Sequence, residues 1–187
     1  ERVISSEDIR YLPGTSGDVV RVVQNLPGVA RPPLNVGQLI IRGTAPEDSA
    51  YYLDGGKIPL VFHFSGLTTV VPSDILEEVA FLPGNYGVRY GRNLGGVVDL
   101  RTSTELPEEN KAYVAVDVYQ TTAFVQRKLG ERSALTLSGR RSYVDAVLNP
   151  ILNQGSARVQ APRYYDFQAR YQHKTAQGGH LDAFVLL

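Results

Sequence analysis

The sequence predicts two regions: an α+β domain with a small mixed sheet and short helices over residues 1–104, then antiparallel strands over residues 111–187. Three observations support this division. The first region alternates short apolar segments with proline and glycine turns. The second shows longer alternation of apolar and polar residues with a period of two. A polar, proline-containing segment at residues 105–110 separates them, and we expect it to be a linker.

The composition excludes several classes of function. The chain has 187 residues with 19 basic and 19 acidic side chains, so no basic surplus favours nucleic acid. The absence of cysteine excludes a disulfide scaffold, a thiolate metal site and a cysteine nucleophile. Methionine is also absent, so we expect a processed or excised piece with any signal peptide upstream of Glu1. No apolar run approaches the ~18–20 residues that a membrane helix needs.

The first region begins with a short strand at Arg2–Ser5 and continues with a helix at Asp18–Leu26. The helix is predicted because apolar residues at i, i+3, i+4 and i+7 form one stripe, comprising Val19, Val22, Val23 and Leu26. Asp18 or Ser16 can cap its start, and Pro27-Gly28 ends it.

Strands and a hairpin follow. We expect strands at Gln38–Arg42 and Ala50–Leu53, a tight turn at Asp54-Gly55-Gly56, and a returning strand at Lys57–Val61. Ser73 is predicted to cap a second helix, because acidic residues that favour a helix N-terminus follow it, namely Asp74, Glu77 and Glu78. Val79–Leu82 and Val97–Arg101 are the remaining strands of this region.

The second region predicts about five strands. In the first of them, Ala112, Val114, Val116 and Val118 share one face, opposite Tyr113, Ala115, Asp117 and Tyr119. Similar alternation runs through residues 123–129, 135–143, 165–172 and 181–187. Short turns at 130–132 and 176–179 contrast with a long connection at 144–163, which is typical of outer-membrane barrels. Taken alone, however, these strands favour a soluble antiparallel sheet.

Five short motifs in the first region carry a resemblance. They are Ile41-Arg42-Gly43, Tyr52-Leu53-Asp54-Gly55, Leu76-Glu77-Glu78-Val79, Tyr90-Gly91 and Gly95-Gly96-Val97-Val98. In this order and spacing they resemble the plug domain of TonB-dependent outer-membrane receptors, in the form found in the Oar-like branch. Joined to such a plug, residues 111–187 are interpreted as the first strands of an incomplete transmembrane β-barrel. The barrel of this family has 22 strands. At ~10 residues per strand it needs more than ~220 residues before loops are counted, so residues 111–187 can form only part of it.

The resemblance implies a TonB-dependent active transporter or receptor in the outer membrane of a Gram-negative bacterium. The plug would lie in the barrel lumen and gate the passage of a substrate. The implied partners are a periplasmic TonB-type energy transducer, outer-membrane lipid and an unidentified extracellular substrate. We expect no enzyme activity, no cofactor and no bound metal. Two alternatives remain: a structural or secretion-linked outer-membrane protein on the same scaffold, and a soluble periplasmic binding module.

The resemblance also implies a plug signature and a polar contact between plug and barrel, which we call the plug–barrel lock. These residues are Arg42, Gly43, Asp54, Gly55, Glu78, Arg89, Tyr90, Gly91, Arg92, Gly95 and Gly96. Arg42 would pair with glutamates of the barrel wall, or else be an exposed arginine at a strand end. Many family members have Arg-Gly-Pro where this chain has Phe81-Leu82-Pro83-Gly84, so Arg89 or Arg92 would replace that arginine.

Loops that face the outside substrate in the family correspond to residues Thr44, Glu47, Asp48, Phe62, His63 and Phe64. The alternative for Phe62-His63-Phe64 is a packed loop, which we favour. Turn chemistry accounts for Asp54-Gly55. The glycines at 91, 95 and 96 lack the lysine and hydroxyl residue of a phosphate-binding loop, so close packing or positive φ explains them better. His63, His173 and His180 have no metal-ligand spacing.

Overall fold

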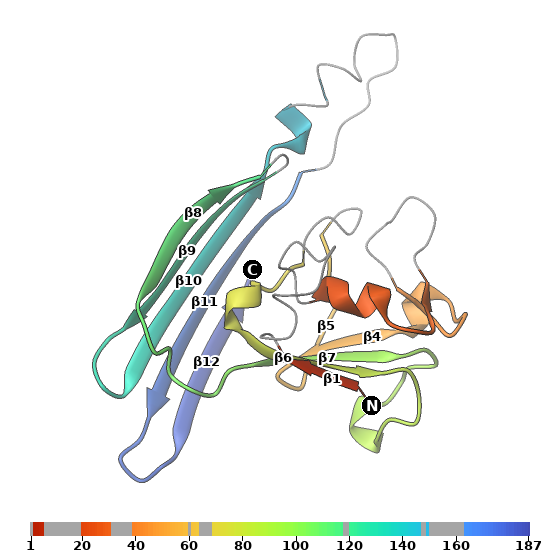
Figure 1. Cartoon of the computed structure of the whole chain (residues 1–187), viewed down its shortest axis with the longest axis horizontal. Helices are drawn as coiled ribbons and strands as arrows, with labels where there is room; N and C mark the ends of the chain where they lie inside the picture. Colours follow the sequence, from red (N-terminus) through yellow and green to blue (C-terminus); the bar gives the residue numbers. More distant parts are fainter. Residues whose placement is uncertain are drawn as a thin grey trace. The chain divides into compact units, whose positions relative to one another are not determined.

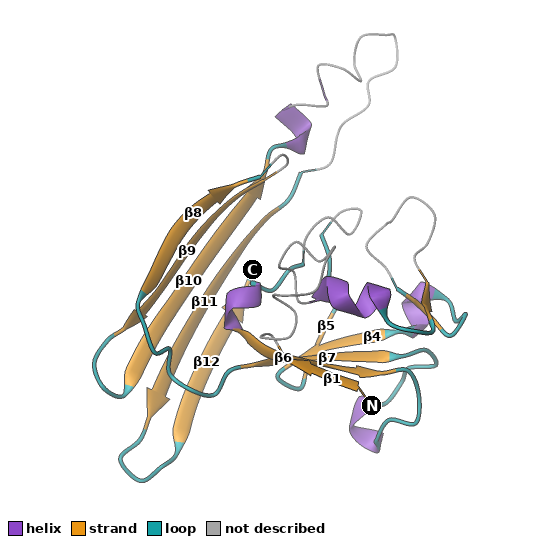
Figure 2. Cartoon of the chain, viewed as in Figure 1, coloured by secondary structure: helices purple, strands orange, loops and turns teal. Residues whose placement is uncertain are grey.

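The computed structural model describes residues 2–5, 20–30, 39–59, 61–63, 69–117, 120–146, 149 and 163–187. The chain divides into two compact units, Glu1–Thr104 and Glu105–Leu187, which we call the first unit and the second unit. Strands dominate the described part of both (Figures 1 and 2).

The first unit contains a five-stranded mixed sheet with the strand order β1-β6-β7-β4-β5. Its strands are β1 (Arg2–Ser5), β4 (Ala50–Leu53), β5 (Gly56–Ile58), β6 (Leu76–Leu82) and β7 (Val97–Thr102). Only the β4–β7 pair among these is parallel. A separate two-stranded sheet pairs β2 (Val29–Ala30) with β3 (Ile40–Ile41). The mixed sheet confirms the predicted fold class of this region.

The β4–β5 hairpin turns at Asp54 and Gly55, as the sequence predicts. Both residues have positive φ, 48° and 83°, which is the two-residue turn whose twist matches paired strands. Asparagine, aspartate and glycine tolerate this region of backbone space better than other residues do.

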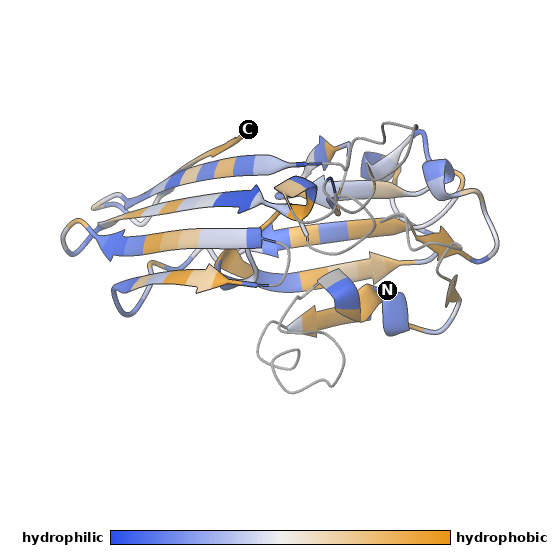
Figure 3. Cartoon of the chain, turned by 90° about the horizontal axis from the view of Figure 1, so that it is seen from above, coloured by the Kyte–Doolittle hydropathy of each residue, from blue (hydrophilic) through white to orange (hydrophobic). Residues whose placement is uncertain are grey.

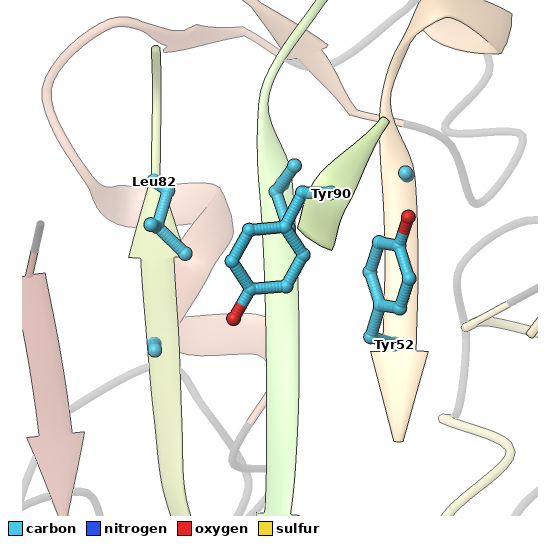
Figure 4. Packing of buried hydrophobic residues seen from close by; sticks show 6 residues of the cluster. Tyr52, Leu82 and Tyr90 are labelled. Carbon is cyan, nitrogen blue, oxygen red and sulfur yellow. The ribbon is translucent and has the colours of Figure 1, made fainter. Parts of the chain in front are cut away.

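Both faces of the sheet are largely buried along its three central strands, β6, β7 and β4. One face carries Tyr51, Phe81, Val98 and Leu100, all at most 8% exposed. The other carries a cluster formed by Ala50, Tyr52, Ala80, Leu82, Tyr90 and Val97. In this cluster the Tyr90 ring lies between Leu82 and Tyr52 (Figure 4), and its centroid is 5.1 Å from that of Tyr52 in an edge-to-face arrangement. The segment around Tyr90 therefore belongs to the core of the first unit.

The helices differ from the prediction. The predicted helix at Asp18–Leu26 is a six-residue 3₁₀ helix, η1 (Val20–Asn25), within the described residues; positions 18–19 lie outside them. Two residues of the predicted apolar stripe, Val22 and Val23, are buried, and Leu26 is half-buried. Three further 3₁₀ turns are η2 (Pro46–Asp48), η4 (Ser73–Ile75) and η5 (Val88–Tyr90).

The predicted second helix, from Ser73 through Glu78, was wrong. The chain makes the single turn η4 and enters β6 at Leu76, and no side chain caps the turn. Pairing with β7 explains the difference, because a strand partner outweighs a local preference for helix. The strand predicted at Gln38–Arg42 is described only as β3, Ile40–Ile41; Arg42 and Gly43 have positive φ and end it.

The second unit is an antiparallel meander with the order β12-β11-β10-β9-β8. Its strands are β8 (Lys111–Val116), β9 (Gln120–Lys128), β10 (Ser133–Ser142), β11 (Tyr165–Lys174) and β12 (His180–Leu186). They confirm the five predicted antiparallel strands. The segment predicted as a linker contacts this unit, since Glu105 pairs with Lys174 and Asn110 Oδ1 accepts a hydrogen bond from Lys128 N.

Burial in the second unit is the reverse of a soluble sheet. On the two central strands β10 and β11, eight side chains of the polar face are at most 8% exposed, namely Thr136, Ser138, Arg140, Ser142, Asp166, Gln168, Arg170 and Gln172. The apolar face is exposed: Val114 and Val116 are each 71% exposed and Val185 is 51% exposed. Figure 3 shows the alternation of hydrophobic and hydrophilic residues along the strands. Ion pairs lie on the polar face, including Arg140 Nε to Asp166 Oδ1 at 3.0 Å.

Among the described residues, no helix has the length and apolar character needed to cross a bilayer.

Candidate functional site

The candidate site is built around Asp99, a carboxylate in the middle of the central strand β7. Alternation places Val97, Asp99 and Arg101 on one face, opposite Leu82, Ala80 and Glu78 of β6 in the antiparallel register. Asp99 is 1% exposed. A buried carboxylate is costly unless several donors or a positive charge compensate it.

Three side chains supply that compensation, and all of them reach the same carboxylate oxygen. Tyr90 OH donates to Asp99 Oδ2 at 2.7 Å, Arg89 Nη2 at 3.0 Å and Arg101 Nε at 3.2 Å. Arg101 also pairs with Glu78 through Nη1, and Arg89 donates to the Tyr90 hydroxyl. These five residues form what we call the Asp99 cluster. It links β6, β7 and η5.

The second oxygen of Asp99 stands apart from these bonds. Among the described residues, the buried Oδ1 has no hydrogen-bond partner. The three hydrogen bonds described above therefore all go to Oδ2. Loss of one of the three donors leaves only two to compensate the negative charge.

Electrostatics within the cluster favour the charged state of its arginines. Burial lowers the pKa of Arg101, but hydrogen bonds to Glu78, Asp99 and Tyr90 outweigh this effect and raise it overall. The pKa of Arg89 is raised chiefly by its hydrogen bond to Tyr90. Both guanidiniums therefore remain charged at any physiological pH.

A pocket of about 400 Å³ opens beside the cluster. It is lined by Asp54, Gly55, Glu77, Glu78, Arg89, Asp99, Arg101, Thr102 and Thr104. Asp54 has a structural role there, because its carboxylate accepts hydrogen bonds from Thr102 N at 2.8 Å and Thr102 Oγ1 at 2.7 Å. These bonds tie the β4–β5 turn to the end of β7. The other charged side chains of the pocket are the carboxylates of Glu77, Glu78 and Asp99 and the guanidiniums of Arg89 and Arg101, so the lining is strongly polar.

The predicted signature residues meet only in part. Glu78, Arg89 and Tyr90 come together in the Asp99 cluster. Asp99 and Arg101 complete it, yet the sequence analysis did not select them. A usable signal was present, since Asp99 is a charged residue inside the apolar run Val97-Val98-Asp99-Leu100. A charge within a buried strand indicates a partner elsewhere in the fold.

Arg42 lies apart from this cluster and is exposed. It has a φ of 53°, and its Nη1 lies 3.0 Å from the position that a Cβ on Gly84 would occupy. Within the described residues it forms no ion pair. Arg92 is likewise exposed and has a φ of 62°. Gly91 directly precedes it and is also exposed.

Gly95 and Gly96 are positions of close packing. A Cβ on Gly96 would lie 2.6 Å from Ile41 Cδ1, and one on Gly95 would lie 2.8 Å from Ser49 Oγ. Ile41 is fully buried. The two glycines therefore let the start of β7 approach β3 and the segment before β4.

The loop residues predicted to face a substrate are not equivalent. Thr44 Oγ1 bonds to the Ile41 carbonyl at 2.8 Å, and Glu47 is exposed in η2 beside the half-buried Asp48. Phe62 is 3% exposed and bridges to Thr69, so it lies in the core rather than on a ligand-facing surface. His63 is half-buried, and Phe64 lies outside the described residues. Three or more metal-ligating side chains do not converge anywhere in the described part of the chain.

Comparison with protein families gives one match. A family model described as the TonB-dependent receptor plug domain matches residues 1–97. None of the curated proteins matches the chain.

Solved structures share the fold. The siderophore receptor PirA from Pseudomonas aeruginosa is 20% identical, with a TM-score of 0.60 over 98% of this chain and 32% of that one. The ferric-catecholate import receptor Fiu from E. coli is 19% identical, with a TM-score of 0.61 over 98% and 26%. The ferric citrate transporter FecA is 19% identical, with a TM-score of 0.62 over 99% and 30%. The chain thus spans about a third or less of the structures that it matches.

Proposed function

Since the chain belongs to the TonB-dependent receptor plug domain family, we propose that it forms the plug and the first barrel strands of an outer-membrane transporter or receptor. The plug corresponds to residues 1–104 and the barrel strands to residues 111–187, joined by residues 105–110. The family is one of transport receptors rather than enzymes. The role that we assign is gated passage of a substrate across the outer membrane.

The observation that carries the proposal is the reversed burial of the second unit. A sheet that exposes valines and buries arginine, aspartate and glutamine fits a wall with lipid outside and polar surroundings inside. A soluble sheet would do the opposite, because burial of apolar surface drives its folding. The reversal therefore favours a membrane wall over a soluble periplasmic module.

The proposed mechanism is mechanical. A ligand binds from outside, and a periplasmic TonB-type protein then pulls on the plug and remodels it. The Asp99 cluster suits such a step, because its bonds are polar and the side chains of Arg89 and Arg101 are 63% and 38% exposed, so water can solvate the guanidiniums as the bonds open. An apolar contact of equal area would resist separation more strongly, because separation exposes apolar surface to water.

The test is uptake by living cells. Deletion of the gene should abolish accumulation of the substrate, and complementation should restore it only in cells that have a functional TonB. Radiolabelled iron chelated by citrate or a catecholate is the first probe, because the similar solved structures are receptors for such complexes. Unchanged uptake of every chelate together with loss of surface-protein export would instead support the secretion-linked alternative.

The plug–barrel lock is a separate part of the proposal. The guanidinium of Arg42 is exposed and has no carboxylate partner among the described residues, so it is available for a glutamate of the barrel wall. Arginine holds a carboxylate through two parallel hydrogen bonds. We expect Arg42→Gln to loosen the plug and to sensitise cells to a bulky antibiotic that the outer membrane normally excludes. Glu47→Gln, on an exposed turn, is the matched control. Equal resistance of the Arg42→Gln strain and wild type would rule the lock out.

A further inference from the structure

Two arginines and two tyrosines alternate at one end of the apolar face of the second unit. Arg141 pairs with Tyr165 in the antiparallel register of β10 and β11. Ser142 N donates to the Tyr164 carbonyl just beyond this pair, and Tyr143 and Arg163 are the next residues of the two segments. We call these four residues the arginine–tyrosine row. It lies where β10 ends and β11 begins (Figure 1).

The row belongs to the apolar face rather than the polar one. The neighbouring Ser142 and Asp166 are buried on the polar face. Tyr164 also points to that side, because its hydroxyl donates to the buried Gln120 Oε1 at 2.8 Å. Alternation along the strands therefore turns Arg141, Arg163 and Tyr165 to the opposite side.

The charges of the row are not neutralised within the chain. Arg141 and Arg163 are exposed, and in the described part of the chain neither pairs with a carboxylate. Tyr165 is 77% exposed. Tyr143 is half-buried. Two guanidiniums without a carboxylate partner among the described residues, next to an exposed phenol ring, form a surface that attracts an anionic group attached to an apolar molecule.

The position along the strands agrees with headgroup depth. Between Arg141 and Ser133, β10 turns only Gly139, Leu137 and Leu135 to the apolar face. Eight residues of strand span ~27 Å before tilt, close to the ~25 Å apolar band of an outer-membrane barrel. The row thus lies at the edge of the band, on the side of the long connection at 144–163. Outer-membrane barrels turn their long loops outward.

We propose that the arginine–tyrosine row binds the phosphate group of an anionic lipid in the outer leaflet. The guanidiniums would donate to the phosphate oxygens, while the tyrosine rings pack against the glycerol or sugar region next to the acyl chains. This inference rests on the proposed function, because it needs the apolar face to lie in a membrane.

The opposite end of the same face is different and provides a control. There Ser133 Oγ and His173 Nδ1 bond to each other at 2.8 Å, and the exposed Arg127 lies on the neighbouring strand β9. Arg127→Gln therefore removes the same charge from the same face without touching the row.

The experiment measures lipid binding by the full-length receptor in detergent. Fluorescent lipid A is compared with its dephosphorylated form for wild type, for Arg141→Gln/Arg163→Gln and for Arg127→Gln. Because each arginine near a charged lipid surface strengthens binding, we expect the double variant to bind lipid A at least about tenfold more weakly. It should bind the dephosphorylated lipid as wild type does. Arg127→Gln should retain the preference for phosphate.

Several outcomes would overturn the inference. One is an unchanged preference for phosphate in the double variant, and another is displacement of the lipid by millimolar inorganic phosphate, which would indicate a free-anion site. If the double variant fails to fold, Arg141→Lys/Arg163→Lys retains the charge and must retain the preference. Failure of the proposed function is separate: the receptor would not fractionate with the outer membrane, whatever its lipid binding.

Discussion

At the scale of single residues, Asp99 connects η5 to β7 in the interior of the plug. Its carboxylate receives bonds from Arg89, Tyr90 and Arg101, which come from two separate segments. One buried charge therefore holds η5 against β7, and with it the whole loop between β6 and β7. The loop's own apolar contact to the sheet is the Tyr90 ring against Tyr52. The hydrogen bonds to Asp99 and the aromatic contact of Tyr90 therefore hold the same segment against the sheet.

Replacement of Asp99 tests that role. Asp99→Asn keeps the shape but removes the charge, so the bonds from Arg89 and Arg101 lose their charge-assisted strength. Because Arg89 is 63% exposed, water compensates part of the loss. We expect the plug to lose about 1–3 kcal/mol of unfolding free energy in urea. Glu47→Gln should change it by less than about 0.5 kcal/mol. Equal effects of the two substitutions would contradict a special role for Asp99.

Tyr51 gives a prediction about alkaline pH. Burial raises the pKa of its phenol to about 12, above the ordinary value of 10.0. The neutral phenol is thus favoured in the folded state. Its contribution to stability is complete below pH 10 and is lost as the pH rises towards 12, by at most roughly 1.4 kcal/mol per pH unit. Urea unfolding between pH 9 and 12 should show a shallower decline for Tyr51→Phe than for wild type. Tyr165→Phe, at an exposed position, should follow wild type, and parallel curves for all three would refute the assignment.

The limits of the sequence are clearest at residues whose partners are distant. Asp54 was interpreted correctly as a turn residue because the determinants of a tight turn are adjacent in the chain. Asp99 was missed because two of its three partners, Arg89 and Tyr90, come from a separate segment, and no local spacing predicts that contact. Arg42, by contrast, was selected from a motif, and the part of the chain that the structure describes provides no carboxylate for it.

At the scale of elements, β6 shows how a partner strand overrides local preference. Ser73, Asp74, Glu77 and Glu78 have the composition of a helix start, and yet the segment from Leu76 is a strand. Glu78 lies directly opposite Arg101 of β7 and pairs with it. Glu78 therefore serves a cross-strand ion pair rather than a helix dipole. Apolar periodicity did locate the long strands of the second unit, because alternation over ten residues is a strong signal.

The junction between β3 and β7 provides an element-scale prediction. Gly96→Ala would bring a methyl group within 2.6 Å of Ile41 Cδ1, and Ile41 is fully buried. Overpacking of this kind costs about 1–3 kcal/mol. Gly87→Ala is the matched control, because its φ is −66° and a Cβ there would meet nothing within 4 Å. Thermal unfolding should separate the two variants, and an equally stable Gly96→Ala would show that the junction can relax.

At the scale of the whole molecule, the two units follow opposite rules of burial. The plug sheet buries apolar residues on both faces, as a water-soluble domain does. The second unit buries its polar face and exposes its apolar face. Periodicity alone could not distinguish the two cases, because alternation looks the same whichever face meets water. The motifs of the first unit favoured a membrane barrel over a soluble sheet. The structure then gave the exposure of each described side chain in the second unit.

The absence of cysteine makes this reversal directly measurable. Because the chain contains no cysteine, a single introduced thiol identifies one position without background from this region. Thiols at Val114 and Val185, on the apolar face, should carry spin labels that collide with oxygen dissolved in lipid and avoid a water-soluble relaxation agent. A label at Glu131, in the turn between β9 and β10, should show the reverse, since that position is exposed next to charged residues. Val88 is fully exposed on the plug and is the control for an apolar residue outside the barrel wall. If the labels at Val114 and Val185 respond as the label at Glu131 does, the apolar face is in water and the membrane assignment of the second unit fails.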